Sequence, residues 1–329
     1  MTTALPRYRA LTFGVTRGLR RDAPDGTTYL QAEQPLAPHA HRLTDRLVHW
    51  ATVAPQRSFM ARRERLADGR TGDWQHLSYA DALDAARRIG QALLDRGLNA
   101  ERPVLIVSEN DLEHAQLALG CLYAGIPWAP ASPAYSLVSQ DFEKLRHIVR
   151  TLTPGLVFAS DAARYERALL ATVGDDVELV TTTGTVPGRA TTSFAALRAT
   201  AATPAVDAAM QATGPDTIAK FLFTSGSTKL PKGVINTHRM WCANQQQIVA
   251  SIPALADPEQ PPVLVDWLPW NHTFGGNHNV GLTLHNGGTL FIDDGKPTPA
   301  LMAETLRNLR EIAPTVYFNV PTGFEAIAN

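Results

Sequence analysis

Cysteine and long apolar runs are scarce in this 329-residue chain. The two cysteines, Cys121 and Cys242, are too few for a disulfide framework and stand in no metal-binding spacing, which favours a reducing compartment such as the cytoplasm. The most apolar stretch, residues 117–131, is interrupted by Gly125, Pro127 and Pro130 and is too short to span a bilayer. Residues 1–21 lack the apolar core of a secretory signal. Export and membrane insertion are therefore not expected.

An excess of charge of either sign is also missing. The chain has 30 basic and 31 acidic residues and a formal net charge of -1. It therefore exerts no general attraction on nucleic acid or on an anionic membrane surface, and neither is expected as a partner. With 44% hydrophobic and 19% charged residues, it can bury a full core.

Three nucleotide- and metal-binding patterns are absent. No G-x-G-x-x-G follows a predicted strand, which removes support for a nicotinamide-binding fold. The order Gly-Lys-Ser/Thr of an NTPase P-loop does not occur in the glycine-containing loop discussed below. His272 and His278 lie six residues apart, but no third ligand accompanies them, so they do not predict a metal site.

Helical and strand patterns alternate from Leu77 onward. Ser78 stands three residues before Asp81 as a capping box, and an apolar period of three to four residues follows until Gly97. Short apolar runs such as "PVLIVSEN" and "GLVFAS" read as buried strands between the helices. This alternation predicts an α/β fold of layered parallel sheets flanked by helices.

Composition along the chain suggests three parts: an N-terminal arm over 1–44, a first α/β subdomain over 45–200 and a second over 201–329. Residues 184–216 are predicted to form a long connection, and "TVYFNVP" at 315–321 a strand. The last residues begin a new helical pattern, so we expect this chain to be the N-terminal portion of a longer protein.

The segment "FLFTSGSTKLPKGVI" at 221–235 places an apolar strand before a hydroxyl-rich loop, and a helix is expected after it. Backbone N–H groups, hydroxyls and one lysine in such a loop suit the phosphates of a nucleotide. Three of the five lysines in the chain lie within 220–232. The alternative is a surface turn with a solvated lysine. The candidate phosphate ligands are Thr224, Ser225, Gly226, Ser227, Thr228 and Lys232.

This loop resembles the T-S-G-[ST]-T-G-x-P-K-G signature of the acyl-adenylate-forming superfamily, with one departure: Lys229 replaces a glycine. The resemblance implies that residues 224–233, including Lys229 and Gly233, hold the phosphates of ATP. It further implies that Lys232 acts in catalysis on the leaving pyrophosphate, and that Thr228 contributes to a Mg²⁺ site. Lys229 tolerates a positive φ poorly, so either the backbone there is ordinary or its ammonium adds a phosphate contact.

A second motif of the superfamily, P-x-x-H-x-x-G, is matched at 269–275. The resemblance places His272 beside the acyl pocket and the route of the thiol; without the motif, His272 would be read as an ordinary core histidine. Trp267, Trp270 and Phe274 would form a flat apolar slot for an aromatic ring, or ordinary core. The predicted substrate-pocket residues are Trp270, Asn271, Phe274 and Gly275.

Segments 131–160 and 263–279 are similar to feruloyl-CoA synthases, which implies a hydroxycinnamate as the acid, with ATP, Mg²⁺ and coenzyme A. Two alternatives stay open: a synthetase for a fatty or other aromatic acid, and a non-catalytic nucleotide-binding module. The superfamily's Y-G-x-T-E segment does not occur, and no lysine follows Lys296 to serve as its adenylation lysine. We therefore expect the chain alone to bind nucleotide weakly and to turn over little.

Overall fold

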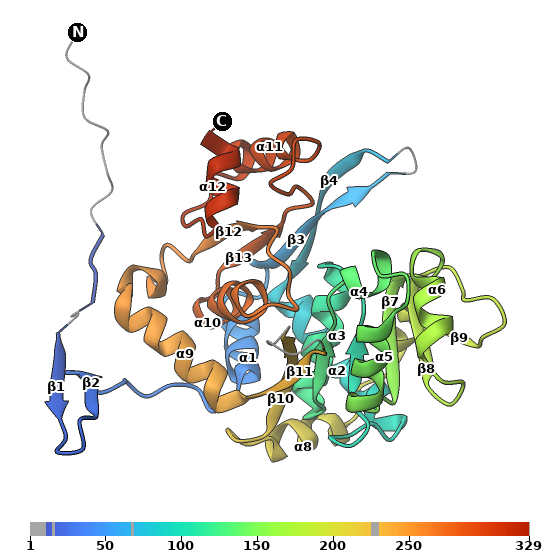
Figure 1. The fold of residues 1–329 in the computed structure, drawn as a ribbon, viewed down its shortest axis with the longest axis horizontal. Coiled ribbons are helices and arrows are strands. Elements are labelled where there is room, and N and C mark those ends of the chain that lie inside the picture. The colour runs from blue at the N-terminus through green and yellow to red at the C-terminus, as the bar shows by residue number, and fades with distance from the viewer. Residues whose placement is uncertain (1–10, 15–16, 67–68, 225–229, 329) are drawn as a thin grey trace, which may run out of the picture.

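Two β-sheets with a layer of helices between them form the body of the computed structural model, which describes residues 11–14, 17–66, 69–224 and 230–328 (Figure 1). The larger sheet has seven strands in the order β11-β10-β6-β5-β7-β8-β9, and the smaller has four in the order β12-β13-β3-β4. A separate hairpin, β1 with β2, stands apart from the body on the N-terminal arm (Figure 1).

The strands are β1 Gly18–Asp22, β2 Thr28–Ala32, β3 Ser58–Arg65, β4 Thr71–Ser78, β5 Val104–Ile106, β6 Trp128–Pro130, β7 Leu156–Asp161, β8 Glu178–Thr183, β9 Thr191–Ser193, β10 Ile218–Thr224, β11 Lys232–Thr237, β12 Val263–Asp266 and β13 Thr289–Ile292. The α-helices are α1 Leu43–Val53, α2 Tyr79–Asp95, α3 Leu112–Ala124, α4 Ala134–Leu137, α5 Glu143–Leu152, α6 Ala162–Thr172, α7 Phe194–Ala199, α8 Pro204–Ala212, α9 His238–Ser251, α10 Val280–Asn286, α11 Met302–Ile312 and α12 Pro321–Ala328. A 3-10 turn, η1, covers Pro253–Ala256, and a π-helix, η2, covers Thr273–Asn279.

The seven-stranded sheet is covered on both faces, which explains its continuous apolar strands. Val104 and Ile106 of β5 pack with α2, α3 and α7, while Leu105 between them packs with α5 and α6 on the other face. All its pairs are parallel except the edge pair of β10 with β11, which is antiparallel. The predicted α/β class with layered, helix-flanked sheets is confirmed, with antiparallel strands added at the edges.

Helices α2 and α3 lie between the two sheets and join them into one core. Their apolar side chains pack against Met60 of β3 and Leu290 of β13 as well as against the larger sheet. The two helices approach closely where Gly120 faces Ile89: a Cβ on Gly120 would lie 2.5 Å from that side chain. The N-terminus of α2 is capped as predicted, because the Ser78 side chain accepts from the Asp81 N–H.

Two predictions about elements are wrong. Residues 184–216 are not a plain connection: they contain β9, α7 and α8, whose apolar residues Phe194, Leu197 and Val206 are buried. Residues 315–320 do not form a strand, because Thr315 and Val316 both donate to the single carbonyl of Val263 and no ladder continues from there. An apolar run alone does not form a strand without a free sheet edge along its whole length.

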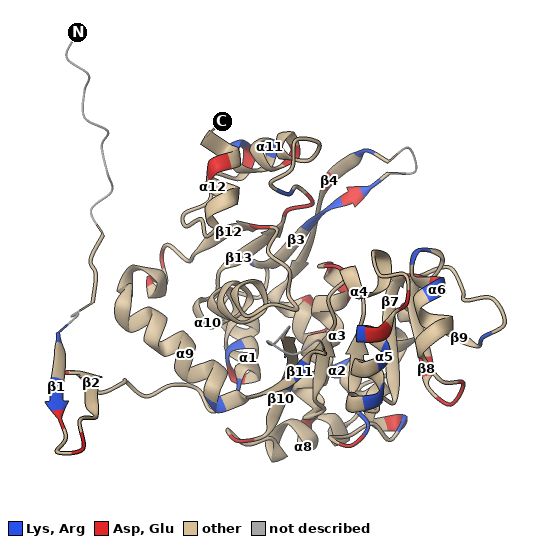
Figure 2. Cartoon of the chain, in the orientation of Figure 1, with Lys and Arg blue, Asp and Glu red and all other residues tan. Residues whose placement is uncertain are grey.

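Both sheets take strands from either side of residue 200, because β10 and β11 complete the larger sheet and β3 and β4 the smaller. The subdomain boundaries at residues 44 and 200 stay a prediction. Positive and negative residues are interspersed over the larger sheet and its helices (Figure 2). In the described part of the chain, no helix combines the length and the apolar character needed to cross a membrane.

Candidate functional site

The predicted phosphate loop joins two antiparallel strands. Strand β10 ends at Thr224, which pairs with Lys232 at the start of β11, and the chain enters α9 only at His238. The strand expected before the loop and the helix expected after it are present as β10 and α9, but β11 between them was not predicted, so the loop closes a hairpin at the edge of the larger sheet. Val234 and Ile235, β-branched residues that suit a strand, form part of β11, a strand that was not predicted from the sequence.

The described ends of this hairpin present their polar groups to solvent. Thr224, Lys232 and Gly233 are exposed, so Lys232 is free to meet an anion at the loop. His147 of α5 holds the returning chain, with Nε2 2.9 Å from the carbonyl oxygen of Pro231. The other predicted phosphate ligands lie outside the described residues: Ser225, Gly226, Ser227, Thr228 and Lys229.

The second motif forms a π-helix, η2, with His272 at its N-cap. His272 Nδ1 accepts from the Phe274 N–H at 3.3 Å, and the side chain is exposed rather than held in the core. The wide turn packs directly on the preceding backbone: a Cβ on Gly276 would lie 2.1 Å from the Trp270 carbonyl oxygen, and one on Gly275 2.4 Å from that of Leu268. The paired glycines are therefore required for this geometry.

Side chains from both hairpin strands hold η2 in place. Lys220 Nζ of β10 donates to the Gly276 carbonyl at 3.0 Å, and Asn277 Nδ2 donates to Asn236 Oδ1 of β11 at 2.9 Å. From α9, Trp241 Nε1 donates to the Asn277 carbonyl at 2.9 Å. These bonds satisfy carbonyls in the widened turn. The hydrogen bonds thus join the elements next to the two sequence motifs, with β10, β11 and α9 on one side and η2 on the other.

Lys220 is the residue of this contact that sequence reasoning left without a role. It is fully buried, its Nζ lies 3.7 Å from the centroid of the Trp241 ring and 5.2 Å from that of Trp128, and no carboxylate pairs with it in the described part of the chain. Burial lowers the pKa of Lys220 well below its ordinary value. A lysine inside the apolar strand "IAKFLF" was the signal that could have identified it.

The predicted acid-pocket residues have different surroundings. Trp270 is buried, with its ring edge-on to His114 at 5.0 Å, and Phe274 packs edge-on against Phe318 at 6.4 Å. Asn271 and Trp267 line a cavity, described next, that is larger than a single side-chain pocket. Among the described residues no ring contact joins the three aromatic side chains of the predicted slot, and their role with a substrate stays a prediction.

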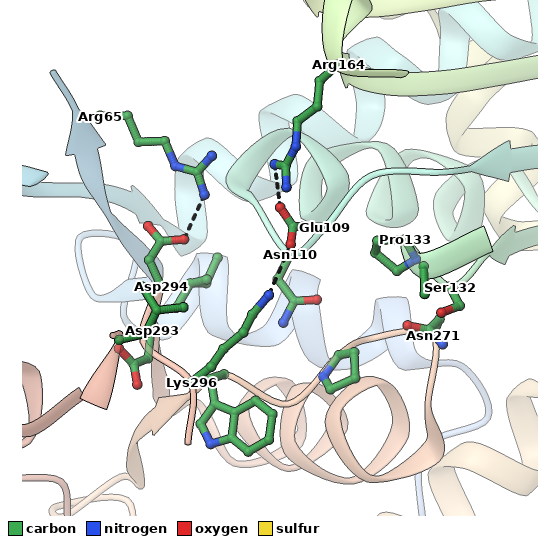
Figure 3. Close-up of a pocket in the computed structure, with 15 residues that line it drawn as sticks. Arg65, Glu109, Asn110, Ser132, Pro133, Arg164, Asn271, Asp293, Asp294 and Lys296 are labelled. Atoms are coloured by element: carbon green, nitrogen blue, oxygen red, sulfur yellow. Dashed lines mark hydrogen bonds and ion pairs between the residues drawn. The ribbon is translucent and has the colours of Figure 1, made fainter. Parts of the chain in front are cut away.

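That larger cavity, of about 540 Å³, lies where the strands of both sheets end (Figure 3). Glu109 and Asn110 follow β5, Ser132 follows β6, Trp267 follows β12 and Asp294 follows β13. Crevices at the carboxyl ends of parallel strands are the usual ligand sites of open α/β sheets. Because β10 runs parallel to β6, the phosphate loop leaves the sheet at this same edge.

Charges in the cavity are balanced by ion pairs. Arg164 contacts Glu109 at 2.6 Å, Lys296 contacts Glu109 at 3.2 Å, and Arg65 contacts Asp294 at 2.9 Å (Figure 3). Burial alone would raise the pKa of Glu109, but Arg164 and Lys296 outweigh it, so the pKa falls below its ordinary value. Arg62 and Arg65 likewise lower the pKa of Asp294. Both carboxylates are therefore ionised at neutral pH, and each is shared by two cations.

The described residues offer no ready-made metal site. They contain no group of three or more histidine, cysteine, aspartate or glutamate side chains placed to hold an ion. Mg²⁺ binds proteins with few ligands when phosphate oxygens supply the rest. Thr228, the predicted contributor, lies outside the described residues, so its role stays a prediction.

A layered α/β body with a polar cavity at the carboxyl ends of its strands defines the general class, an open α/β protein with a crevice for a small ligand. The family follows from comparison with known proteins. The model of the AMP-binding enzyme family matches residues 47–329, and the chain belongs to this family.

The relatives carry several kinds of activity. A salicylyl-CoA synthase / salicylate adenylyltransferase of a Streptomyces species is 30% identical over 241 residues, which cover 69% of this chain and 42% of that protein. The long-chain-fatty-acid–CoA ligase ACSBG1 of Bos taurus is 24% identical over 278 residues, 78% of this chain and 35% of that protein. The chain thus spans less than half the length of these curated relatives.

Solved structures show the same fold. The adenylation domain of a keto acid-selecting NRPS module, bound to a keto acyl adenylate, superposes with a TM-score of 0.68 at 20% identity, covering 89% of this chain and 49% of that one. ATP-bound MatB from Rhodopseudomonas palustris gives a TM-score of 0.65 at 25% identity, covering 86% and 50%. The sequence resemblance to adenylate-forming enzymes is thereby confirmed at the level of family and fold.

Proposed function

We propose that the protein activates a carboxylic acid with ATP and transfers the acyl group to the thiol of coenzyme A, and that the acid is a hydroxycinnamate such as ferulate. The observation that carries the proposal is the direct bonding of η2, which bears His272, to both strands of the hairpin that bears the phosphate loop. Phosphate binding and acid binding would then share one rigid unit. The two buried free cysteines suit a cytoplasmic location.

In the first step, a carboxylate oxygen of the acid attacks the α-phosphorus of ATP. The new C(O)O–P bond replaces the bond to the β-phosphate oxygen, and pyrophosphate leaves with the electron pair. Lys232, exposed beside Thr224, neutralises charge on the leaving group, as preorganised cations do for a developing anion. Mg²⁺, when bound, shares the phosphate charge.

In the second step, the thiol of coenzyme A attacks the carbonyl carbon of the acyl adenylate. The C–S bond forms, the bond to the phosphate oxygen breaks, AMP leaves and the thiol proton passes to solvent. His272 stands exposed at the N-cap of η2, so its side chain would form the rim past which the thiol arrives. Its Nδ1 accepts from the Phe274 N–H, which orients the ring at this rim.

Pyrophosphate release from Mg·ATP is the test, measured with ferulate, benzoate and octanoate on the protein that the gene encodes and on the 329-residue chain. Release stimulated mainly by ferulate supports the hydroxycinnamate proposal. Release mainly with benzoate or octanoate supports the proposed adenylation but shows that the substrate is another acid. No release by the gene-encoded protein, despite ATP binding, would favour a nucleotide-binding module. We expect the 329-residue chain to release little, since the Y-G-x-T-E glutamate is absent from it.

A further inference from the structure

A second cavity, which we call the arm pocket, lies between the N-terminal arm and helices α1, α9 and α10. Its volume is about 320 Å³, at the lower end of the range for ligand sites. None of its lining residues belongs to the β10–β11 hairpin, to η2 or to the cavity at the strand ends. The polar and aromatic residues that line it are His39, Arg46, Trp50, Gln246, His285 and Asn286.

Arg46 is the charged residue of the arm pocket and has no counter-charge. Its Nε donates to the His285 carbonyl at 2.8 Å and its guanidinium lies 5.1 Å from the Trp50 ring centroid. In the described part of the chain no carboxylate pairs with it, whereas Arg62 pairs with Asp294 at 2.8 Å. Burial lowers the pKa of Arg46. A half-buried guanidinium without an anion is costly, which points to a partner from solution.

The remaining polar side chains of the arm pocket are histidine rings and amides, none of which carries a negative charge. His285 is 8% exposed, and its Nδ1 has no hydrogen-bond partner. Burial lowers the pKa of His285 to about 4, so its ring is neutral at physiological pH. His39 and Gln246 add a second ring and an amide, and the lining, all of it described, contains no aspartate or glutamate. The pocket therefore favours an anion and offers a cation no ligand charge.

We propose that the arm pocket binds a small oxyanion, a phosphate or carboxylate group, on the Arg46 guanidinium. The planar fork of arginine donates two parallel hydrogen bonds to such a group. The amide of Gln246, which lines the same pocket, supplies a further contact. Because His39 comes from the arm and Arg46 from α1, a bound anion joins the arm to the body. This site does not depend on the proposed function.

Thermal unfolding with inorganic phosphate, against chloride at equal ionic strength, tests the proposal. We expect phosphate at about ten times its Kd to raise the Tm by about 2 °C. Arg46→Gln should remove the rise. Arg57→Gln is the matched control: Arg57 also lies over Trp50, at 5.5 Å, and donates to a backbone carbonyl, but it does not line the pocket. For each variant the Tm in phosphate is compared with its Tm in chloride, so that the effect of the substitution on stability itself cancels.

Phosphate could also raise the Tm from the phosphate loop, so Lys232→Ala is measured in parallel. A rise that survives Lys232→Ala and Arg57→Gln but not Arg46→Gln supports the arm pocket. A rise lost with Lys232→Ala, retained with Arg46→Gln, or absent from the wild type overturns it. Acetate in the same series shows whether a carboxylate or a phosphate binds more tightly.

Discussion

The amine of Lys220 is buried in an almost entirely apolar environment. It donates to one carbonyl, that of Gly276, and otherwise faces the rings of Trp241 and Trp128. The face of an indole ring attracts a cation, but such attraction offsets only part of the loss of water. Lys220 lies between the β10–β11 hairpin and η2, and its hydrogen bond holds the widened turn of η2. A shorter or apolar side chain could not make this bond.

Replacement of Lys220 by methionine tests this account of its burial. The pKa of Lys220 is depressed in the folded state, so the unfolded chain binds more protons between that pKa and 10.5, and wild-type stability rises with pH in that window. Lys220→Met lacks this dependence. We expect the variant to lose about 1 kcal/mol near pH 10, from the missing hydrogen bond, and to recover relative to wild type toward pH 7. Urea unfolding across this range measures the difference; parallel curves would contradict the depressed pKa.

Lys232 and Lys229 should differ in their effect on nucleotide use. Lys232 starts β11 opposite Thr224 and is exposed toward the loop, so Lys232→Ala should raise the KM for ATP and lower turnover by about tenfold to a hundredfold. Lys229, which stands where related loops carry glycine, should tolerate Lys229→Gly with activity retained. Pyrophosphate release by the gene-encoded protein is the assay. Equal losses in both variants would show that the ranking of the two lysines is wrong.

At the scale of elements, the N-cap of helix α3 is a buried carboxylate. Asp111 caps the helix by accepting from the His114 N–H, and it is buried. Burial, with Glu113 nearby, raises the pKa of Asp111 to about 7. The folded state therefore holds a proton that the unfolded chain releases near 3.8, and the associated stability is lost as the pH rises from about 4 to about 7.

Asp111→Asn should remove this loss, because asparagine caps helices as well as aspartate does and does not titrate. Relative to wild type, the variant should gain stability between pH 4.5 and 7.5, by about 1–3 kcal/mol, and the gain should level off above the pKa. Urea unfolding at several pH values measures it. Asp161→Asn, at the N-cap of α6, controls for the loss of a capping carboxylate. A gain of the same size at every pH would refute the explanation.

Elements whose pattern is local could be predicted from the sequence, and those fixed by distant partners could not. The cap and length of α2 followed from Ser78, Asp81 and an apolar period. The strand after the phosphate loop was not predicted, because β11 exists only by pairing with β10. The motif around His272 was found from sequence, whereas its π-helical form depends on Lys220, Trp241 and the backbone of 268–270.

At the scale of the whole molecule, the two sheets meet through polar side chains at their carboxyl edges as well as through the shared helices. Asn110, after β5, donates from Nδ2 to the Leu268 carbonyl at 2.9 Å and accepts on Oδ1 from the Trp270 N–H at 3.0 Å. Both bonds reach the segment after β12 that leads into η2. One side chain of the larger sheet thus fixes the backbone beside the acid-pocket motif on the smaller.

Asn110→Ala should therefore lower the stability of the whole fold and not only of the local turn. It leaves the Leu268 carbonyl and the Trp270 N–H without partners, and since Trp270 is buried, we expect a loss of about 2–4 kcal/mol in the free energy of unfolding. Asn99→Ala is the matched control: Asn99 is exposed, its Oδ1 accepts only from the nearby Glu101 and Arg102 N–H groups, and its removal should cost about 1 kcal/mol or less. Urea unfolding compares the two variants, and tryptophan fluorescence reports on the indole surroundings. Equal losses and an unchanged spectrum would mean that the Asn110 contact adds nothing to the junction of the two sheets, and that the acid-pocket segment keeps its form without it.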